Sequence, residues 1–185
     1  LRSAPRKPEL PTLEELAEAT AIVALQPSTT GNLVRLRDKH LIFSDDRKAF
    51  VMFGCQGGSW IAMGDAVGPE ESADDAAWKF REACDLAGVH PVFYQVDEEN
   101  LSRYIDMGLA LLKLGEEARV DLKSFSLDGG ANKDLRRSNR KAIEEGLTFE
   151  IIPQAQVMSI MSDLKRISEA WLGDKSAAEK GFSLG

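Results

Sequence analysis

The spacing of apolar residues changes along the chain, and the first segment has the spacing of a helix. Thr12 and Glu15 have the T-x-x-E pattern of a capping box, and Pro27 ends the segment. Between these limits the apolar residues recur at helical intervals, at Leu13, Leu16, Ala17, Ala21 and Leu25. We therefore predict a helix that begins after Thr12, whereas residues 33–39 fit either a short helix or a strand.

Three short runs rich in aromatic and branched residues come next, at 40–44, 48–55 and 59–63. They are separated by Asp45–Asp46 and by Gly57–Gly58, residue types that form the tight turns of hairpins. The pattern predicts three consecutive antiparallel strands.

Two helices and a further strand are predicted after this meander. On residues 70–87 the apolar positions share one helical face: Ala73, Ala77, Phe80 and Cys84. Gly88 follows as a C-terminal cap. Residues 91–96, PVFYQV, are apolar enough for a central strand, and residues 98–107 fit another helix.

The run Leu109 to Leu122, LALLKLGEEARVDL, is expected to complete the sheet. Its first part is almost continuously apolar, its second part alternates apolar and charged residues, and Gly115 lies between them. We predict two neighbouring strands joined by a tight turn. The resulting order of helix, three antiparallel strands, helix, strand, helix, strand, strand is that of the GNAT-type acyltransferase fold. This is an α/β (α+β) class with a mostly antiparallel central sheet.

The chain then begins again with a helix, a strand and a helix. Asn132 or Asp134 begins a predicted basic helix that runs to Glu145, and Leu147–Ile152 fits a strand. A last amphipathic helix is marked by Val157, Ile160, Met161, Leu164, Ile167 and Trp171. We predict a linker over 1–11, a first GNAT-like domain over 12–128, a connecting basic helix over 129–146 and the beginning of a second GNAT-like domain over 147–185.

The composition is that of a globular protein, with 43% hydrophobic and 29% charged residues and a net charge of -7. The acidic balance argues against a chain that binds nucleic acid over its whole surface, although it leaves room for a local basic patch.

No apolar run of about 18 residues occurs, so no segment is expected to span a bilayer. The start, LRSAPRKPEL, lacks an apolar signal-peptide core and is interpreted as a linker. The end, EKGFSLG, suggests a fragment of a longer protein.

Metal and nucleophile chemistry find little support in the sequence. Cys55 and Cys84 lie among apolar residues, and the chain has only two histidines, so we predict reduced core cysteines and no metal site. Gly57–Gly58 and Ser59 lack the Lys-Ser or Lys-Thr of a phosphate loop and the G-x-S-x-G of a nucleophile elbow. A hairpin turn is the preferred interpretation there.

The segment Gly64–Glu71 stands where a GNAT acetyltransferase binds the pyrophosphate of coenzyme A, at a loop and the start of the next helix. Here four carboxylates crowd that helix start: Glu70, Glu71, Asp74 and Asp75. They repel an anion, and the usual basic and glycine-rich signature is absent, so the sequence disfavours acetyl-CoA. Asp65, at a strand end, is either a catalytic base or, by preference, a cap on the loop.

A basic stripe lies on the predicted helix after residue 132. Its members are spaced i, i+3, i+4, i+7 and i+8 and share one helical face: Lys133, Arg136, Arg137, Arg140 and Lys141. Such a stripe suits the phosphates of RNA or of lipid headgroups. The alternative is a solvated face balanced by Glu144 and Glu145.

The last segment, Glu179–Gly185, carries two glycines that permit close approach of the backbone to a ligand, and Lys180 is able to pair with an anion. By spacing alone it is the start of a strand.

Five segments of the chain resemble, in the same order, the cytosolic domain of the phosphatidylglycerol lysyltransferase family. They are WIAMGDAVGP, PVFYQV, LLKLGEEARVDL, LRRSNRKAIEEGLTFEII and EKGFSLG. The family is also called the lysyl-phosphatidylglycerol synthases or multiple peptide resistance factors. The resemblance covers nearly the whole chain from about Leu10, and KLGEEARVDL and EKGFSLG are specific to the family rather than to the fold.

The resemblance implies an activity and a location. In such proteins an N-terminal transmembrane flippase region precedes a pair of GNAT-like domains at the cytoplasmic face of the bacterial inner membrane, so this segment would be soluble within an integral membrane protein. The pair moves a lysyl or alanyl group from aminoacyl-tRNA to the glycerol hydroxyl of phosphatidylglycerol. The modified lipid attracts cationic antimicrobial peptides less. No cofactor is implied, because the ester of aminoacyl-tRNA is already activated.

The resemblance also implies where the site lies. Most catalytic and lipid-tunnel residues of the family belong to the second GNAT-like domain, so the catalytic residues are expected beyond Gly185 and this segment is expected to be catalytically incomplete. The EKGFSLG motif lies near the cleft of the family, which makes Glu179, Lys180 and Ser183 candidates for catalysis and Gly181 and Phe182 candidates for substrate binding. The basic stripe becomes a candidate for contact with tRNA or membrane, and the first domain a scaffold.

Two other functions remain open at this stage. One is an ordinary acyl-CoA-dependent GNAT acyltransferase, which the acidic helix start disfavours. The other is a non-catalytic module whose basic helix docks on membrane or RNA. The sequence does not distinguish lysine from alanine as the transferred residue.

Overall fold

The computed structural model describes residues 8–27, 29–175 and 181–183. The chain divides into two compact units, one that reaches Leu112 and also holds the 181–183 segment, and one that begins at Lys113.

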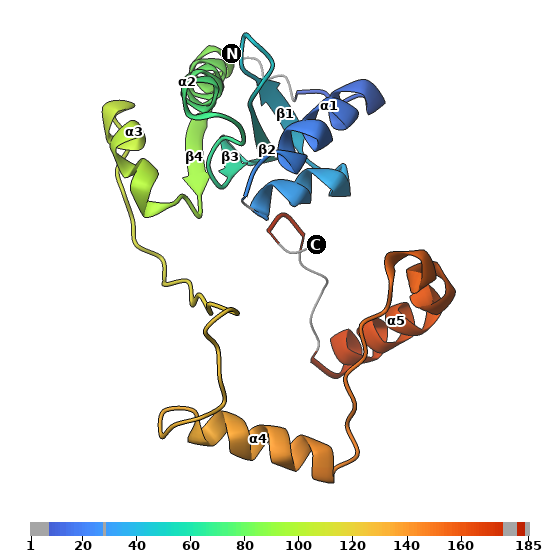
Figure 1. Ribbon diagram of the computed structural model, residues 1–185. Helices are drawn as coiled ribbons and strands as arrows, with labels where there is room; N and C mark the ends of the chain where they lie inside the picture. Colours follow the sequence, from blue (N-terminus) through green and yellow to red (C-terminus); the bar gives the residue numbers. More distant parts are fainter. Residues whose placement is uncertain (1–7, 28, 176–180, 184–185) are drawn as a thin grey trace. The chain divides into compact units, whose positions relative to one another are not determined.

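The first unit is built on a four-stranded sheet with the order β1-β2-β3-β4 (Figure 1). The strands are β1 (His40–Phe43), β2 (Phe50–Gln56), β3 (Ser59–Met63) and β4 (His90–Tyr94). The first three pair antiparallel, and β4 pairs parallel to β3. This confirms the predicted meander and the mostly antiparallel sheet. The prediction of a central strand at 91–96 is wrong, because β4 lies at one edge: among the described residues only β3 pairs with it.

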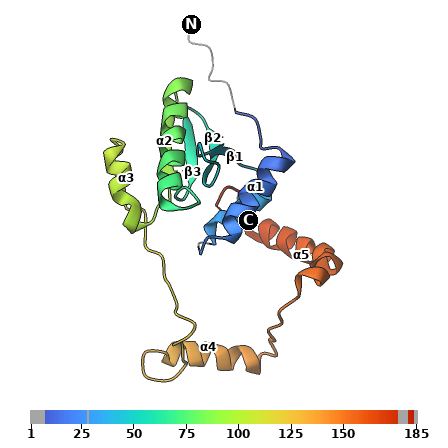
Figure 2. The same cartoon turned by 45° about the horizontal axis from the view of Figure 1, so that its top comes forward.

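Helices cover both faces of the sheet (Figure 2). On one face α1 (Leu13–Ala24) and the short 3-10 helix η1 (Thr30–Leu36) pack against Phe50 and Met52. On the other face α2 (Glu70–Ala87) packs against Val51 and Phe53. Successive residues of β2 point to opposite faces, so this one strand contributes to both layers of the core. The segment 33–39, which the sequence left open, is largely this 3-10 helix.

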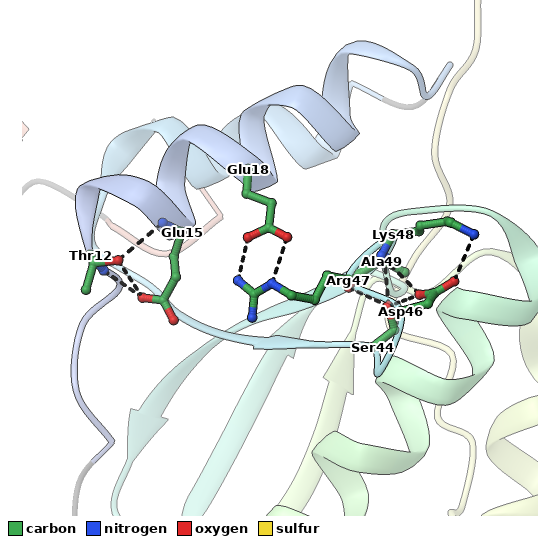
Figure 3. Close-up of polar contacts among 8 residues, drawn as sticks. All are labelled: Thr12, Glu15, Glu18, Ser44, Asp46, Arg47, Lys48 and Ala49. Carbon is green, nitrogen blue, oxygen red and sulfur yellow. Dashed lines mark hydrogen bonds and ion pairs between the residues drawn. The ribbon is translucent and has the colours of Figure 1, made fainter.

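The start of α1 has the predicted capping box. The Thr12 hydroxyl accepts a hydrogen bond from the Glu15 N–H at 3.2 Å, and the Glu15 carboxylate accepts one from the Thr12 N–H at 2.8 Å (Figure 3). One turn further on, Glu18 accepts a bidentate pair of bonds from Arg47, which lies in the turn between β1 and β2. These contacts hold the helix over the edge of the meander.

The face of α2 predicted to be apolar is buried: Ala73, Ala77, Phe80 and Cys84. Gly88 ends the helix in the left-handed conformation, with φ of 68°. Burial raises the pKa of the Cys84 thiol to about 12, so this cysteine behaves as a small apolar residue. After β4 the chain forms η2 (Glu98–Asn100) and α3 (Leu101–Asp106), as predicted for 98–107.

Two sequence predictions of strands are wrong. Residues 109–122 form neither of the two expected strands, and 147–152 form none. The apolar side chains of the first run, such as Leu112, Leu114 and Leu122, are exposed. An alternating pattern becomes a strand only where a neighbouring strand pairs with its N–H and C=O groups, and within the described residues no strand pairs with these runs.

The second unit contains two helices, α4 (Lys133–Glu144) and α5 (Gln154–Lys175). Both were predicted, α4 from its basic pattern and α5 from its amphipathic one. Gly146 follows α4 with φ of 79°, as expected for a residue that ends a helix. Within the described residues, none of the helices has the length and apolar character required to cross a membrane.

Replacement of Gly68 by alanine is expected to destabilise the first unit by more than about 2 kcal/mol. Gly68 has φ of 150°, and a Cβ atom built there would lie 2.4 Å from the Ala49 Cβ and 2.6 Å from the Lys48 carbonyl oxygen. Urea unfolding followed by tryptophan fluorescence measures the loss. Gly88→Ala is the matched control, because Gly88 also has a positive φ but no atom within 4 Å of the added Cβ. Equal losses in the two variants would contradict the role of close packing at Gly68.

Candidate functional site

The loop between β3 and α2 forms backbone hydrogen bonds with two strands, β4 and β2. The Gly64 N–H donates to the Tyr94 carbonyl at 2.7 Å, and Val67 and Phe50 exchange two backbone hydrogen bonds at 2.8 and 3.0 Å. Gly68 then packs directly on Ala49. Because the backbone N–H groups of Gly64 and Val67 are used within the protein, neither is available to bind a phosphate.

The N-terminus of α2 is surrounded by carboxylates, as the sequence predicted. Glu70 and Glu71 occupy its first turn. Asp75 accepts a hydrogen bond from the Asp45 N–H at 2.7 Å, and Asp46 accepts one from the Ser72 hydroxyl at 2.8 Å. The protein's own anions therefore lie at the positive end of this helix, which disfavours a further anion such as pyrophosphate there.

Both carboxylate oxygens of Asp65 accept hydrogen bonds within the protein. One carboxylate oxygen accepts a hydrogen bond from the Tyr104 hydroxyl, and the other accepts one from the Asp97 N–H at 2.8 Å. Burial, together with the negative charge of Asp65, raises the pKa of Tyr104 well above its ordinary value, so the phenol stays protonated and donates. This favours the interpretation of Asp65 as a loop cap that joins the end of β3 to α3.

Of the EKGFSLG motif, the structure describes Gly181, Phe182 and Ser183. They form a tight turn in which the Ser183 N–H donates to the Gly181 carbonyl at 3.0 Å and Phe182 has φ of 66°. The expected strand start is therefore wrong for 181–183, and its other residues are not among those that the structure describes. The candidates Glu179 and Lys180, and also 184–185, lie outside the described residues.

Phe182 packs onto the α1-side face of the sheet. Its ring lies so close to Gly54 of β2 that a Cβ atom there would be 3.2 Å away. The Tyr94 ring is 6.2 Å from it between centroids, and the Lys39 ammonium lies 5.8 Å from the ring centroid. Gly54 thus admits an aromatic ring that any larger residue would displace.

Lys39 lies beside the Phe182 ring, and the sequence pattern does not mark it as a site residue. It is only 2% exposed, and its ammonium pairs with Asp38 at 2.8 Å beside the Phe182 ring. A buried charge needs such partners because its desolvation is costly. No signal in the sequence connects Lys39 with the distant 181–183 segment, since neither spacing nor composition brings them together.

The basic stripe is present on α4, but its members differ in their surroundings. Arg136 is half-buried and donates to the carbonyls of Leu127 and Gly129, at 2.6 Å for the latter, so it holds the preceding turn. Lys141 pairs with Glu145 at 3.6 Å. The remaining three cations make no ion pair within the described residues and are exposed: Lys133, Arg137 and Arg140. They are spaced i, i+4 and i+7 and share one side of a helix that has no buried residue.

No group of three or more His, Cys, Asp or Glu side chains that could bind a metal ion occurs among the residues that the structure describes. Cys55 and Cys84 are both free of disulfide bonds.

Residues 20–185 match the family described as "Phosphatidylglycerol lysyltransferase, C-terminal". The chain belongs to this family. A phosphatidylglycerol lysyltransferase of Bacillus subtilis (strain 168) is 35% identical over 175 residues, which are 92% of this chain and 20% of the relative. A phosphatidylglycerol lysyltransferase of Staphylococcus xylosus is 34% identical over 155 residues, which are 84% of this chain and 18% of the relative.

Two solved structures of the phosphatidylglycerol lysyltransferase family are similar to this chain. The crystal structure of the C-terminal domain of a putative lysylphosphatidylglycerol synthetase from Agrobacterium fabrum has a TM-score of 0.87 and 47% identity, over 93% of this chain and 54% of that one. The structure of L-PGS from Bacillus licheniformis has a TM-score of 0.80 and 32% identity, over 97% and 56%. These similarities agree with the predicted GNAT-like fold. The chain thus spans about a fifth of the curated relatives and about half of the solved chains.

The pH dependence of stability is expected to change when Asp46 is replaced by asparagine. Asp46 accepts hydrogen bonds from the Ser44 hydroxyl at 2.7 Å and the Lys48 N–H at 3.0 Å (Figure 3). Together with the bond from the Ser72 hydroxyl, they hold the pKa of Asp46 well below its ordinary value. A lowered pKa in the folded state adds stability above the unfolded pKa of about 3.9 and loses it as the pH falls toward the folded value.

Asp46→Asn should therefore be less stable than the parent at pH 7 and should lose less of its stability between about pH 4 and pH 2. Urea midpoints over a pH series measure this, with Glu99→Gln as a control for the loss of one exposed carboxylate. If the two variants have the same pH profile, the three donors do not lower the pKa of Asp46 as described.

Proposed function

We propose that the protein transfers a lysyl or alanyl group from aminoacyl-tRNA to the glycerol hydroxyl of phosphatidylglycerol, and so changes the charge of the membrane and its resistance to cationic antimicrobial peptides. The observation that carries the proposal is the family match over residues 20–185, with 47% identity to the C-terminal domain of a putative lysylphosphatidylglycerol synthetase. The proposal includes an N-terminal transmembrane region and a location at the cytoplasmic face of the bacterial membrane.

The proposed reaction is an ester exchange. The glycerol hydroxyl oxygen attacks the aminoacyl carbonyl carbon, the bond to the ribose oxygen of tRNA breaks, and the proton of the glycerol hydroxyl passes to that ribose oxygen. The tRNA ester is already activated, so the carbonyl group needs no further activation step. An ester exchange also changes no oxidation state, so the reaction requires no redox step. The protein has to hold two anionic substrates together and exclude water, which would otherwise hydrolyse the ester.

Within this proposal, the first GNAT-like domain, residues 12–128, supports the site rather than performs the chemistry. The domain limits 12–128, 129–146 and 147–185, with a linker over 1–11, are part of the proposal. Gly181 and Phe182 are proposed to line the substrate site and Ser183, with Glu179 and Lys180, to lie near the reacting groups. The tight contact between Phe182 and Gly54 supports this assignment, because it gives the motif a fixed position on the sheet.

The helix α4 is proposed to bind the phosphates of tRNA. Its exposed cations share one side, whereas its apolar side chains, Leu135 and Ile143, are too few to anchor a helix in a bilayer interface. Phosphate contacts from a helix add affinity without base specificity.

The acyl-CoA alternative is disfavoured by the closed, acidic loop before α2, where Val67 and Gly68 pack against β2 and carboxylates surround the helix start. A calorimetric titration with coenzyme A separates the two enzymes.

The transfer itself is tested with the full-length protein that carries this chain, phosphatidylglycerol liposomes and radiolabelled lysyl-tRNA or alanyl-tRNA. Label in the extracted lipid with one tRNA and not the other is the expected result, because one donor pocket discriminates the two side chains. Liposomes of phosphatidylcholine are the control, since their headgroup carries no glycerol hydroxyl. No label with either tRNA, from folded protein, would favour the coenzyme A enzyme or a binding module.

The double variant Arg137→Glu/Arg140→Glu is expected to weaken tRNA binding and to lower the slope of log K against log salt concentration by about 2, one unit per lost phosphate contact. Lys165→Glu/Arg166→Glu on α5 changes the net charge equally and is the matched control. Binding to phosphatidylglycerol liposomes is measured in parallel. A tRNA affinity that falls equally in both double variants would show that net charge, and not the α4 stripe, determines binding.

A further inference from the structure

The turn of residues 181–183 contacts the sheet through the side chain of Phe182, and both belong to the same compact unit. The ring lies over Gly54 of β2, 3.2 Å from the position of a Cβ atom built there. Phe182 itself has φ of 66°, a conformation that a bulky residue keeps only where its surroundings enforce it. The contacts of this ring therefore determine the conformation of the turn.

The Phe182 ring is surrounded by residues from three parts of the chain. Below it is Gly54, and the Tyr94 ring of β4 is 6.2 Å away between centroids. Lys39, which directly precedes β1, places its ammonium 5.8 Å from the ring centroid, within the range of a cation–π interaction. The next residue, His40, contacts the Phe53 ring in the core on the α2 side. Lys39 is thus directed to the side of the sheet where the turn lies.

A lysine occupies this position although an apolar side chain would fill the same space. Lys39 is 2% exposed, and its ammonium pairs with Asp38 at 2.8 Å. Burial of an ammonium is costly, and the replacement of a buried ion pair by apolar residues is often neutral or stabilising. The packing of the core therefore does not account for the charge, whereas the aromatic ring beside it does.

We propose that Lys39 is a positioning residue: its ammonium holds the Phe182 ring on Gly54 and so fixes the turn that is proposed to line the substrate site. This inference rests on the proposed function, in which Gly181 and Phe182 contact substrate. Without the charge the fold and the proposed phosphate contacts of α4 remain, but the turn is free to shift. A shift of about 1 Å in a group that orients a substrate costs about a hundredfold in rate. The effect therefore falls on kcat rather than on KM for aminoacyl-tRNA.

The first test follows the ring itself, with 4-fluorophenylalanine at position 182 of the full-length protein in detergent. The ring atoms nearest to Gly54 are Cδ2 and Cε2, so a fluorine on Cζ replaces neither of them. The change of the fluorine resonance between H2O and D2O measures the exposure of the ring. Lys39→Met has a similar length without the charge, and is expected to move this isotope shift toward that of free fluorophenylalanine. Lys39→Arg keeps a cation and is expected to retain the shift of the parent.

Arg103→Met is the matched control for the loss of a cation. The Arg103 side chain is 10% exposed and pairs with one aspartate, Asp74 of α2, so its replacement also removes a nearly buried ion pair of the first unit. It is expected to leave the isotope shift at position 182 unchanged.

Gly54→Ala tests the same contact without a change of charge. The added Cβ atom has to displace the Phe182 ring, so this variant is also expected to move the isotope shift toward that of the free amino acid. Gly58→Ala is its control, because a Cβ atom there meets no atom within 4 Å.

The second test measures transfer to phosphatidylglycerol liposomes with the same variants. Lys39→Met and Gly54→Ala are expected to lower kcat by about tenfold with KM for aminoacyl-tRNA unchanged, and Lys39→Arg to restore kcat. Arg103→Met and Gly58→Ala are expected to keep the kcat of the parent.

The proposal is overturned if Lys39→Met leaves the isotope shift unchanged, or if it lowers kcat no more than Arg103→Met does. A parent protein without transfer activity overturns the proposed function and the kinetic role with it. The isotope shift then still decides separately whether Lys39 holds the Phe182 ring, so the two failures are distinguishable.

Discussion

A continuous chain of aromatic rings on the α2 side of the sheet connects most elements of the first unit. Phe53 of β2 contacts Trp60 of β3 and Phe80 of α2 at 5.0 and 5.1 Å between centroids, and Phe93 of β4 lies 5.1 Å from Phe80 and 4.6 Å from Tyr104 of α3. Rings at these distances attract one another beyond their burial, and each belongs to a different element. The chain ends at the Tyr104 hydroxyl, which donates to Asp65. The packing of the core therefore fixes the loop that leaves β3.

Elements whose causes are local could be predicted from the sequence. The capping box at Thr12, the turn at Gly57–Gly58 and the glycine that ends α2 each act over a few residues, so their pattern determines their structure. The run 109–122 shows the limit of this reasoning. Its alternation is that of a strand, but a strand also requires a partner, and the described residues supply none. The pattern specifies which face would be apolar, not whether pairing occurs.

The candidate site divides in the same way. The α4 stripe could be predicted, because helical spacing alone places its cations on one side. The cluster of Phe182, Gly54 and Lys39 could not, because it joins residues from distant parts of the chain. The sequence also could not show that Arg136 holds a turn, since its partners are backbone carbonyls. A charge pattern in the sequence does not reveal which charged side chains form hydrogen bonds with the backbone.

The loop before α2 has the position of an anion site in this fold, but two of its backbone N–H groups are bonded within the protein. A helix N-terminus binds anions only when its N–H groups and its positive end are free. Here Val67 is bonded to Phe50, Gly68 lies on Ala49, and carboxylates such as Asp46 and Asp75 take the place of a ligand. The GNAT-like fold is thus present, and the start of α2 has an environment that disfavours an anion. Within the described residues, the exposed cations of α4 share one side of a helix, and the start of α2 has no comparable positive charge.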